Sequence, residues 1–182
     1  MRFSILVTSL LVAPLADVAA QHTPSQRAGG WFGLGLAYGQ LSGRGVPDAA
    51  NHAAAVHVRT GGTLSSHFRL GGELDLGGGG GMLSAALALS AYAYPVVTAD
   101  FFLKGGIAAR HFNEGIADYP DAVTDLAGVV GFGYDWRLGG RFSITPFAQI
   151  ALALALLTTN EYAESTDWNL TQWHVGLSFT WH

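Results

Sequence analysis

Cysteine is absent from the 182-residue chain, and charged residues make up only 12% of it. Without a thiol, disulfide bonds, thiol chemistry and the cysteine-linked anchor of a lipoprotein are excluded. Lysine occurs once, at Lys104, and the formal net charge is −4. Because nucleic-acid binding needs a basic stripe or patch, no nucleic-acid partner is expected.

Long apolar runs are also missing, since no segment after residue 20 has 18 uninterrupted apolar residues. The first 20 residues have a positive start at Arg2, a short apolar run from Ile5 to Ala13, and small residues before Gln21. This pattern predicts a cleaved signal peptide over residues 1–20. We then expect a polar leader over residues 21–30 and a single domain over residues 31–182.

The end of the chain alternates strictly between large apolar residues and small or polar ones. The large residues are Trp173, Val175, Leu177, Phe179 and Trp181. A period of two over this length predicts a β-strand with one apolar face and one polar face. Seven further segments resemble it, at about 31–40, 52–63, 67–76, 82–94, 100–109, 126–137 and 141–155. The alanines of the fourth segment also suit a helix, and Pro146 predicts an irregularity in the seventh strand.

The polarity of these strands favours a lipid environment. In the third strand, Arg69, Glu73 and Asp75 lie on the face opposite four large apolar residues, and other strands carry glycine on the same side. An exported, apolar chain without spanning helices is best accommodated as a closed barrel. We therefore predict an all-β fold, an eight-stranded antiparallel up-and-down transmembrane barrel. The odd connections are long or glycine-rich and the even ones short, as in barrels with surface loops and periplasmic turns.

Two groups of residues follow from this facing. The predicted polar cluster of the lumen is Arg59, Glu73, Asp75, Lys104, Asp135, Gln149, Gln172 and His174, with Arg69 and Arg137 at the periplasmic mouth. The predicted aromatic girdle at the periplasmic membrane interface is Phe32, Phe68, Phe101, Trp136, Phe142 and Trp181. An eight-stranded barrel is just wide enough for its side chains to fill it, so the cluster is expected to be a plug of paired charges. The glycine-rich inner faces leave a narrow pore as the alternative.

The segment 131–137 (Gly-Phe-Gly-Tyr-Asp-Trp-Arg) before a tight turn, the closing strand and the eight-strand pattern resemble the small outer-membrane barrels of the OmpA/OmpX type. The resemblance implies a Gram-negative outer membrane, with membrane lipid and lipopolysaccharide as neighbours. In that family the final strand is an assembly signal ending in an aromatic residue, which implies the barrel-assembly machinery as a partner. Here Trp181 is followed by His182.

Other functions have weaker signals. Gly77–Gly81 lacks the Lys-Ser/Thr of a phosphate-binding loop. His111, Glu114 and Asp118 have no metal-binding spacing, so a solvated acidic rim is preferred to a cation site, and neither metal nor cofactor is expected. The lipid A deacylases, enzymes on similar barrels, carry an H-x-S-N pattern; the segments beginning at His111 and His174 lack it. A Ser–His pair from distant strands, such as Ser90 with His57 or His174, is the remaining enzymatic alternative.

A soluble lipocalin-like carrier would have the opposite polarity, with polar residues outside and an apolar interior. We therefore predict a non-enzymatic outer-membrane barrel with a role in envelope structure or in contact with an external partner. This function would reside in the four surface loops, because loops carry the variable function of such scaffolds. These loops contain seven acidic residues against Arg44 and Arg110. The acids are Asp48, Glu114, Asp118, Asp121, Glu161, Glu164 and Asp167.

Overall fold

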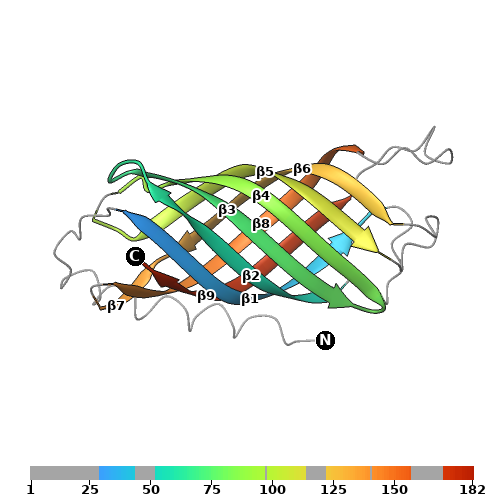
Figure 1. Cartoon of the computed structure of the whole chain (residues 1–182), viewed down its shortest axis with the longest axis horizontal. Coiled ribbons are helices and arrows are strands. Elements are labelled where there is room, and N and C mark those ends of the chain that lie inside the picture. The colour runs from blue at the N-terminus through green and yellow to red at the C-terminus, as the bar shows by residue number, and fades with distance from the viewer. Residues whose placement is uncertain (1–28, 44–51, 97, 114–121, 140, 157–169) are drawn as a thin grey trace, which may run out of the picture.

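The computed structural model of the chain is a closed antiparallel β-barrel (Figure 1). It describes residues 29–43, 52–96, 98–113, 122–139, 141–156 and 170–182, so the predicted signal peptide and most of the leader lie outside the described residues. The strands are β1 (Gly30–Ser42), β2 (His52–Thr63), β3 (Phe68–Gly79), β4 (Met82–Ala93), β5 (Phe101–Asn113), β6 (Val123–Tyr134), β7 (Trp136–Gly139), β8 (Phe142–Leu156) and β9 (Thr171–Trp181). Among the described residues no helix is long and apolar enough to cross a membrane.

Apart from β6 and β7, which do not pair with each other, each strand pairs with the next one in the chain, and the ends of the sheet meet. The closing strand β9 pairs with β1 over eleven positions, from Phe32 opposite Trp181 to Ser42 opposite Thr171. β6 and β7 both pair with β8 and form one strand interrupted at Asp135. The nine labelled strands therefore make an eight-stranded up-and-down barrel, as predicted. Closure leaves no unpaired edge, which is the condition for a sheet to span lipid.

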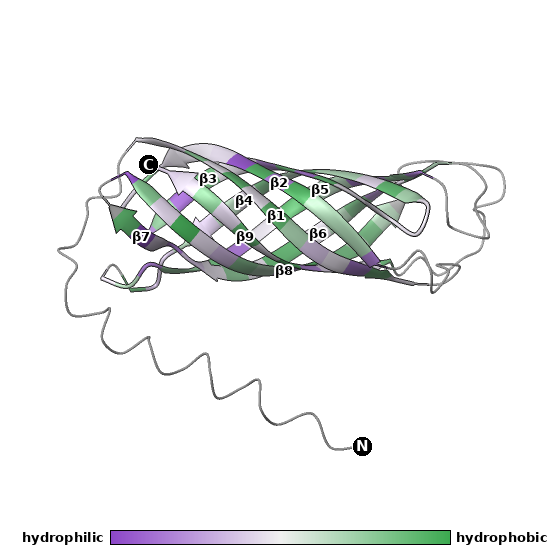
Figure 2. Ribbon diagram, turned by 90° about the horizontal axis from the view of Figure 1, so that it is seen from below, coloured by the Kyte–Doolittle hydropathy of each residue, from purple (hydrophilic) through white to green (hydrophobic). Residues whose placement is uncertain are grey.

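The alternation along the strands sorts residues between lipid and lumen (Figure 2). Large apolar residues lie outside: Phe132, Leu152 and Leu177 are 54%, 45% and 46% exposed. Of the residues that the structure describes, sixteen polar or charged ones are buried inside. The exterior is thus apolar and the interior ionic, the inverse of a soluble protein. We call the end where β1 begins and β9 ends the turn end and the opposite end the loop end.

Several predicted boundaries are wrong, all near strand ends. The predicted loop 110–124 is too long: β5 continues to Asn113 and β6 begins at Val123, so residues 110–113 and 123–124 belong to strands. The predicted glycine loop 77–81 is mostly strand, because β3 runs to Gly79. The turn is made by Gly80 and Gly81, both with positive φ (60° and 88°), which suits a tight two-residue hairpin.

Two local predictions have clear outcomes. The alanine-rich fourth segment is a strand, because every apolar side chain on its outer face has a cross-strand neighbour in β3 or β5. Pro146 does not disturb the pairing of β8 with β9. The irregularity lies on its other side, where the ladder is interrupted between the pairs Gly133–Phe147 and Trp136–Ile144. A residue without an N–H is tolerated there because the facing strand breaks at Asp135.

Candidate functional site: the barrel interior and its lipid-facing surface

A network of charges crosses the middle of the lumen. Lys104 Nζ on β5 lies 2.7 Å from Glu73 Oε2 on β3 and also donates to the Gln149 side-chain oxygen on β8. His57 Nδ1 on β2 is 2.5 Å from Asp75 Oδ1, and Gln149 Nε2 donates to Asp75 Oδ2 at 3.3 Å. Carboxylates buried in a low-dielectric interior require such partners, because unpaired charges there cost several kcal/mol.

A second network closes the turn end around Asp135, which is 1% exposed. Its carboxylate lies 3.2 Å from Arg69 Nη1 and 3.6 Å from Arg59 Nη2. It also accepts hydrogen bonds from Tyr94 and Thr145, both at 2.8 Å. Two guanidinium groups and two hydroxyls compensate one carboxylate, so the interruption of the sixth strand is stabilised by the side chain that it directs inward.

Aromatic side chains occupy the space beside the lumen glycines. A Cβ atom added to Gly61 or Gly71 would lie 2.8 or 2.6 Å from the indole of Trp31, so this ring rests on their backbone. A Cβ on Gly176 would lie 2.5 Å from the ring of Phe147. Trp31 packs with Tyr92, Tyr94 and Phe102 in a buried cluster. The small inner faces thus receive rings from other strands instead of lining an open path.

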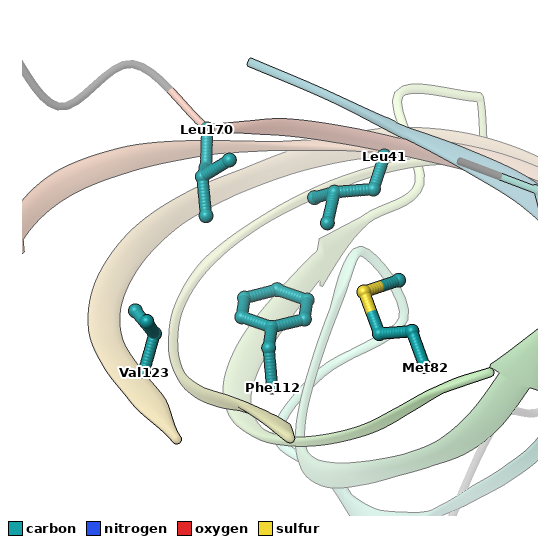
Figure 3. Packing of buried hydrophobic residues seen from close by; sticks show 5 residues of the cluster. All are labelled: Leu41, Met82, Phe112, Val123 and Leu170. Atoms are coloured by element: carbon teal, nitrogen blue, oxygen red, sulfur yellow. The ribbon is translucent and has the colours of Figure 1, made fainter. Parts of the chain in front are cut away.

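The loop end of the lumen is closed by an apolar layer, which we call the cap. It comprises Leu41, Met82, Phe112, Val123 and Leu170, which point toward one another (Figure 3). Beneath it the Arg110 guanidinium forms a two-bond contact with Asp125, with Nε–Oδ1 at 2.8 Å and Nη2–Oδ2 at 2.5 Å. Arg110 and Asp125 are 1% and 0% exposed. The placement of Arg110 in a surface loop is therefore wrong.

The described part of the lumen has little free volume at the level of the central network. A cavity bordered by His57, Tyr92, Lys104, Phe147 and Gln149 holds about 10 Å³. A single water molecule needs about that much. This part of the lumen is consequently filled by side chains.

All eight residues of the predicted polar cluster lie on the inner face. Seven of them are members of the two networks: Arg59 and Asp135 at the turn end, and Glu73, Asp75, Lys104, Gln149 and His174 in the middle. Gln172 is buried nearer the loop end, away from both. Of the two residues expected at the mouth, Arg69 joins Asp135, and Arg137 Nε lies 3.3 Å from Asp100 Oδ1. The functional role of the cluster stays a prediction.

Sequence reasoning missed Arg110 and Asp125, although the signal was available. Along β5 the inward-facing residues have even numbers. If the strand is continued past Ala109, the same alternation places Arg110 and Phe112 in the lumen. Along β6 the odd residues face inward, which includes Asp125. Two residues of opposite charge that both face inward on adjacent strands are candidates for an ion pair. Arg110 and Asp125 are such residues, and they are direct partners in the ladder.

The six aromatic residues of the predicted girdle all lie on the outer face near the turn end. Phe32 and Phe142 both contact Trp181, with ring centroids 6.0 and 5.3 Å apart. Phe68 and Trp136 are 52% and 49% exposed, and Phe101 is partly covered by Phe132. That this band sits at a membrane interface stays a prediction, which the amphipathic character of Trp makes physically reasonable.

Two Ser–His combinations among the described residues, Ser90 with His57 or His174 and Ser143 with His182, lack the hydrogen bonding that a hydrolytic pair needs. The hydroxyl of Ser90 is buried without a hydrogen-bond partner, so it is not paired with His57 or His174. Ser143 Oγ lies 2.9 Å from His182 Nε2, but the other ring nitrogen is 3.2 Å from Arg69 Nη2. Because a guanidinium only donates, Nδ1 must accept and Nε2 carries the proton. The ring cannot then accept a proton from the serine, which a general base has to do.

One group of potential metal ligands is present among the described residues: His57, Glu73 and Asp75. Its donor atoms are already occupied, since Glu73 binds Lys104 and Tyr92 and Asp75 binds His57 and Gln149. An ion would have to displace a lysine ammonium from a buried carboxylate. The arrangement therefore fits an ion-pair network better than a metal centre. The cation site considered at His111 involves Glu114 and Asp118, which lie outside the described residues.

Closure, an apolar exterior and a filled ionic interior define an integral outer-membrane β-barrel. Solved structures agree with this class. The chain is similar to Neisserial surface protein A, with a TM-score of 0.64 at 8% identity over 85% of this chain and 97% of that one. It is similar to the N-terminal β-barrel domain of Pseudomonas aeruginosa OprF, with a TM-score of 0.56 at 12% identity over 86% and 97%.

A third similar structure is Ail, the attachment invasion locus protein of Yersinia pestis, with a TM-score of 0.52 at 12% identity over 85% of this chain and 99% of that one. No family model matches the chain, and no curated protein matches it. These comparisons establish the fold, and the inside-out polarity places the protein in an outer membrane. Their low identities transfer no function.

Proposed function

We propose that the protein is a non-enzymatic, non-conducting outer-membrane barrel that contributes to envelope structure or binds an external partner through its loops. The observation that carries the proposal is the filled lumen. The cap, the two charge networks and the Trp31 cluster lie at successive levels, and the cavity between the networks has room for about one water molecule. With the interior occupied, interaction has to take place at the loops or the lipid-facing wall.

Planar-bilayer recording tests the non-conducting part. We expect the purified barrel to give no steady conductance, because ions would have to cross both the apolar cap and the charge networks. The matched variant is Lys104→Glu, which reverses the single lysine of the central network. Steady conductance of the native protein that changes in this variant would support the narrow-pore alternative and overturn the proposal.

The charge of the loops indicates what kind of partner to test. Ail has been crystallised with the heparin analogue sucrose octasulfate, a polyanion. The loop sequences of this chain carry the seven acids named above, and with Arg110 inside the barrel only Arg44 opposes them. We therefore propose a cationic partner. Cells displaying the protein should bind a polylysine surface more than a heparin surface, and removing the acids of residues 157–169 should reduce that difference. Preferential heparin binding would contradict the proposal.

Compartment, assembly and lack of enzymatic activity need separate measurements. The protein should be recovered in the outer-membrane fraction with heat-modifiable gel mobility, and depletion of the barrel-assembly machinery should reduce that form. Mass analysis of lipopolysaccharide after incubation with the protein should show no acyl chain lost or gained. A changed acyl count would support the lipid A-modifying alternative.

A further inference from the structure

The outer wall near the loop end contains a groove across five strands. Its volume is about 630 Å³, and its lining is mainly apolar. Such a volume lies within the range of about 300–1,000 Å³ that is usual for ligand sites. Most of its lining residues point outward, and Ala37, Ala55, Gly77 and Ser84, which alternate with them on the inner face, also border it.

Two rows of directly paired residues run across the groove, and all of them except Tyr38 line it. One row joins Leu36, Val56, Leu76, Ala85 and His111 across β1 to β5. The next row toward the loop end joins Tyr38, Ala54, Gly78, Leu83 and Asn113.

The hollow results from small residues at the centre of these rows. Ala54 and Gly78 are direct partners between Tyr38 and Leu83, and Ala85 lies beside Leu76. The row nearer the turn end has larger residues at the corresponding positions: Leu34, Val58, Leu74 and Leu87. The groove therefore lies where the outward side chains of β2 to β4 become small.

The geometry points to a binding site for an acyl chain of lipid A in the outer leaflet. Leu36 and Leu83 at its edges are 69% and 65% exposed and belong to the lipid-facing surface, so the groove is continuous with the membrane interface. The surface loops of such barrels are extracellular, so the loop end lies in the outer leaflet. The inference rests on the outer-membrane role proposed above and not on the loops or the lumen.

Polar groups lie at the β5 end of the groove and can receive the headgroup of a bound lipid. His111 and Asn113 are exposed on β5, and His111 Nδ1 is 2.9 Å from Thr124 Oγ1 on β6. An imidazole and a side-chain amide can both hydrogen-bond the phosphate or sugar of a lipid A headgroup. An apolar groove ending at such donors fits a lipid better than it fits the apolar surface of a second barrel.

Native mass spectrometry of the full barrel in detergent tests the inference, with lipid A and phosphatidylethanolamine as alternative probes. We expect the native barrel to retain one lipid A more strongly than phosphatidylethanolamine. Ala54→Leu and Ala85→Leu should each weaken retention by about tenfold, because the new side chain takes the place of roughly two buried methylene groups. Ala109→Leu, an exposed alanine facing outward on β5 outside the groove, is the matched control and should retain lipid A like the native protein.

Three results would overturn the inference. The first is that the groove-filling variants retain lipid A as strongly as the Ala109→Leu control. The second is that the native barrel retains lipid A and phosphatidylethanolamine equally. The third is that the native barrel forms a dimer that Ala54→Leu abolishes. The last would assign the groove to a contact between two copies. Heat-modifiable mobility of each variant separates these results from a failure to fold, and its loss in the native protein would instead contradict the proposed function.

Discussion

Removing one partner of the buried Arg110–Asp125 pair should be among the most destabilising changes in the barrel. Arg110→Met keeps most of the side-chain volume but leaves Asp125, fully buried beneath the cap, without its guanidinium. Two charge-assisted hydrogen bonds, at 2.8 and 2.5 Å, are lost with it. Breaking a buried pair in this way costs about 3–5 kcal/mol, because the buried carboxylate loses its cationic partner.

The double variant Arg110→Met/Asp125→Leu separates this explanation from simple loss of packing. With both charges removed, the cap can extend downward, and we expect the free energy of unfolding to return to within about 1 kcal/mol of the native value. The Leu170 carbonyl, which accepts from Arg110, also accepts from the Ala153 N–H at 2.9 Å and so keeps a partner.

Urea unfolding of the barrel refolded into lipid vesicles, followed by tryptophan fluorescence, measures these differences. Arg141→Met, an exposed arginine at the turn end, is the control and should change the free energy of unfolding by no more than about 0.5 kcal/mol. A cost below about 1 kcal/mol for Arg110→Met would show that water reaches the pair. A double variant as unstable as the single one would show that the cap does not tolerate apolar residues there. Either result refutes the reasoning.

Three further changes test other parts of the structure by the same unfolding measurement. Leu177→Arg, on the lipid-facing side of β9, should cost about 2–4 kcal/mol near mid-bilayer, and native stability of this variant in the membrane fraction would contradict the facing. Gly176→Ala should cost about 1–3 kcal/mol, because its Cβ would lie 2.7 Å from the Leu36 carbonyl oxygen; an unchanged midpoint would contradict that crowding. Burial, with Arg69 nearby, lowers the pKa of His182 to about 4. Since the unfolded state binds this proton near pH 6.5, stability should decline by roughly 1–2 kcal/mol, allowing for partial exposure, as pH falls from about 6.5 to 4. The same decline in His182→Asn would refute that assignment.

The alternation of residue size and polarity was sufficient to predict the architecture. A period of two assigns every residue of a strand to one of two faces, so Trp173 to Trp181 on β9 could be placed outside and His174 inside before any contact was known. The same rule predicted the inner face for the whole polar cluster. The prediction was wrong at the end of β5, which was placed at Ala109 although the strand continues to Asn113. Polar residues that face the lumen resemble the polar residues of a loop, so the end of the strand was placed too early.

The alternation of residues along a strand does not predict which inward-facing side chains contact one another. Partners in the lumen come from strands far apart in the chain: Lys104 reaches both Glu73 and Gln149, and Asp135 joins Arg59, Arg69 and Thr145. These contacts depend on the stagger between strands and on where rings such as Trp31 and Phe147 occupy the space above glycines. The sequence by itself therefore determined the barrel and its inside-out polarity, because facing is a local property of a strand. Only the tertiary structure decided that the interior is filled and that the outer wall is recessed across β1 to β5, because both depend on cross-strand neighbours.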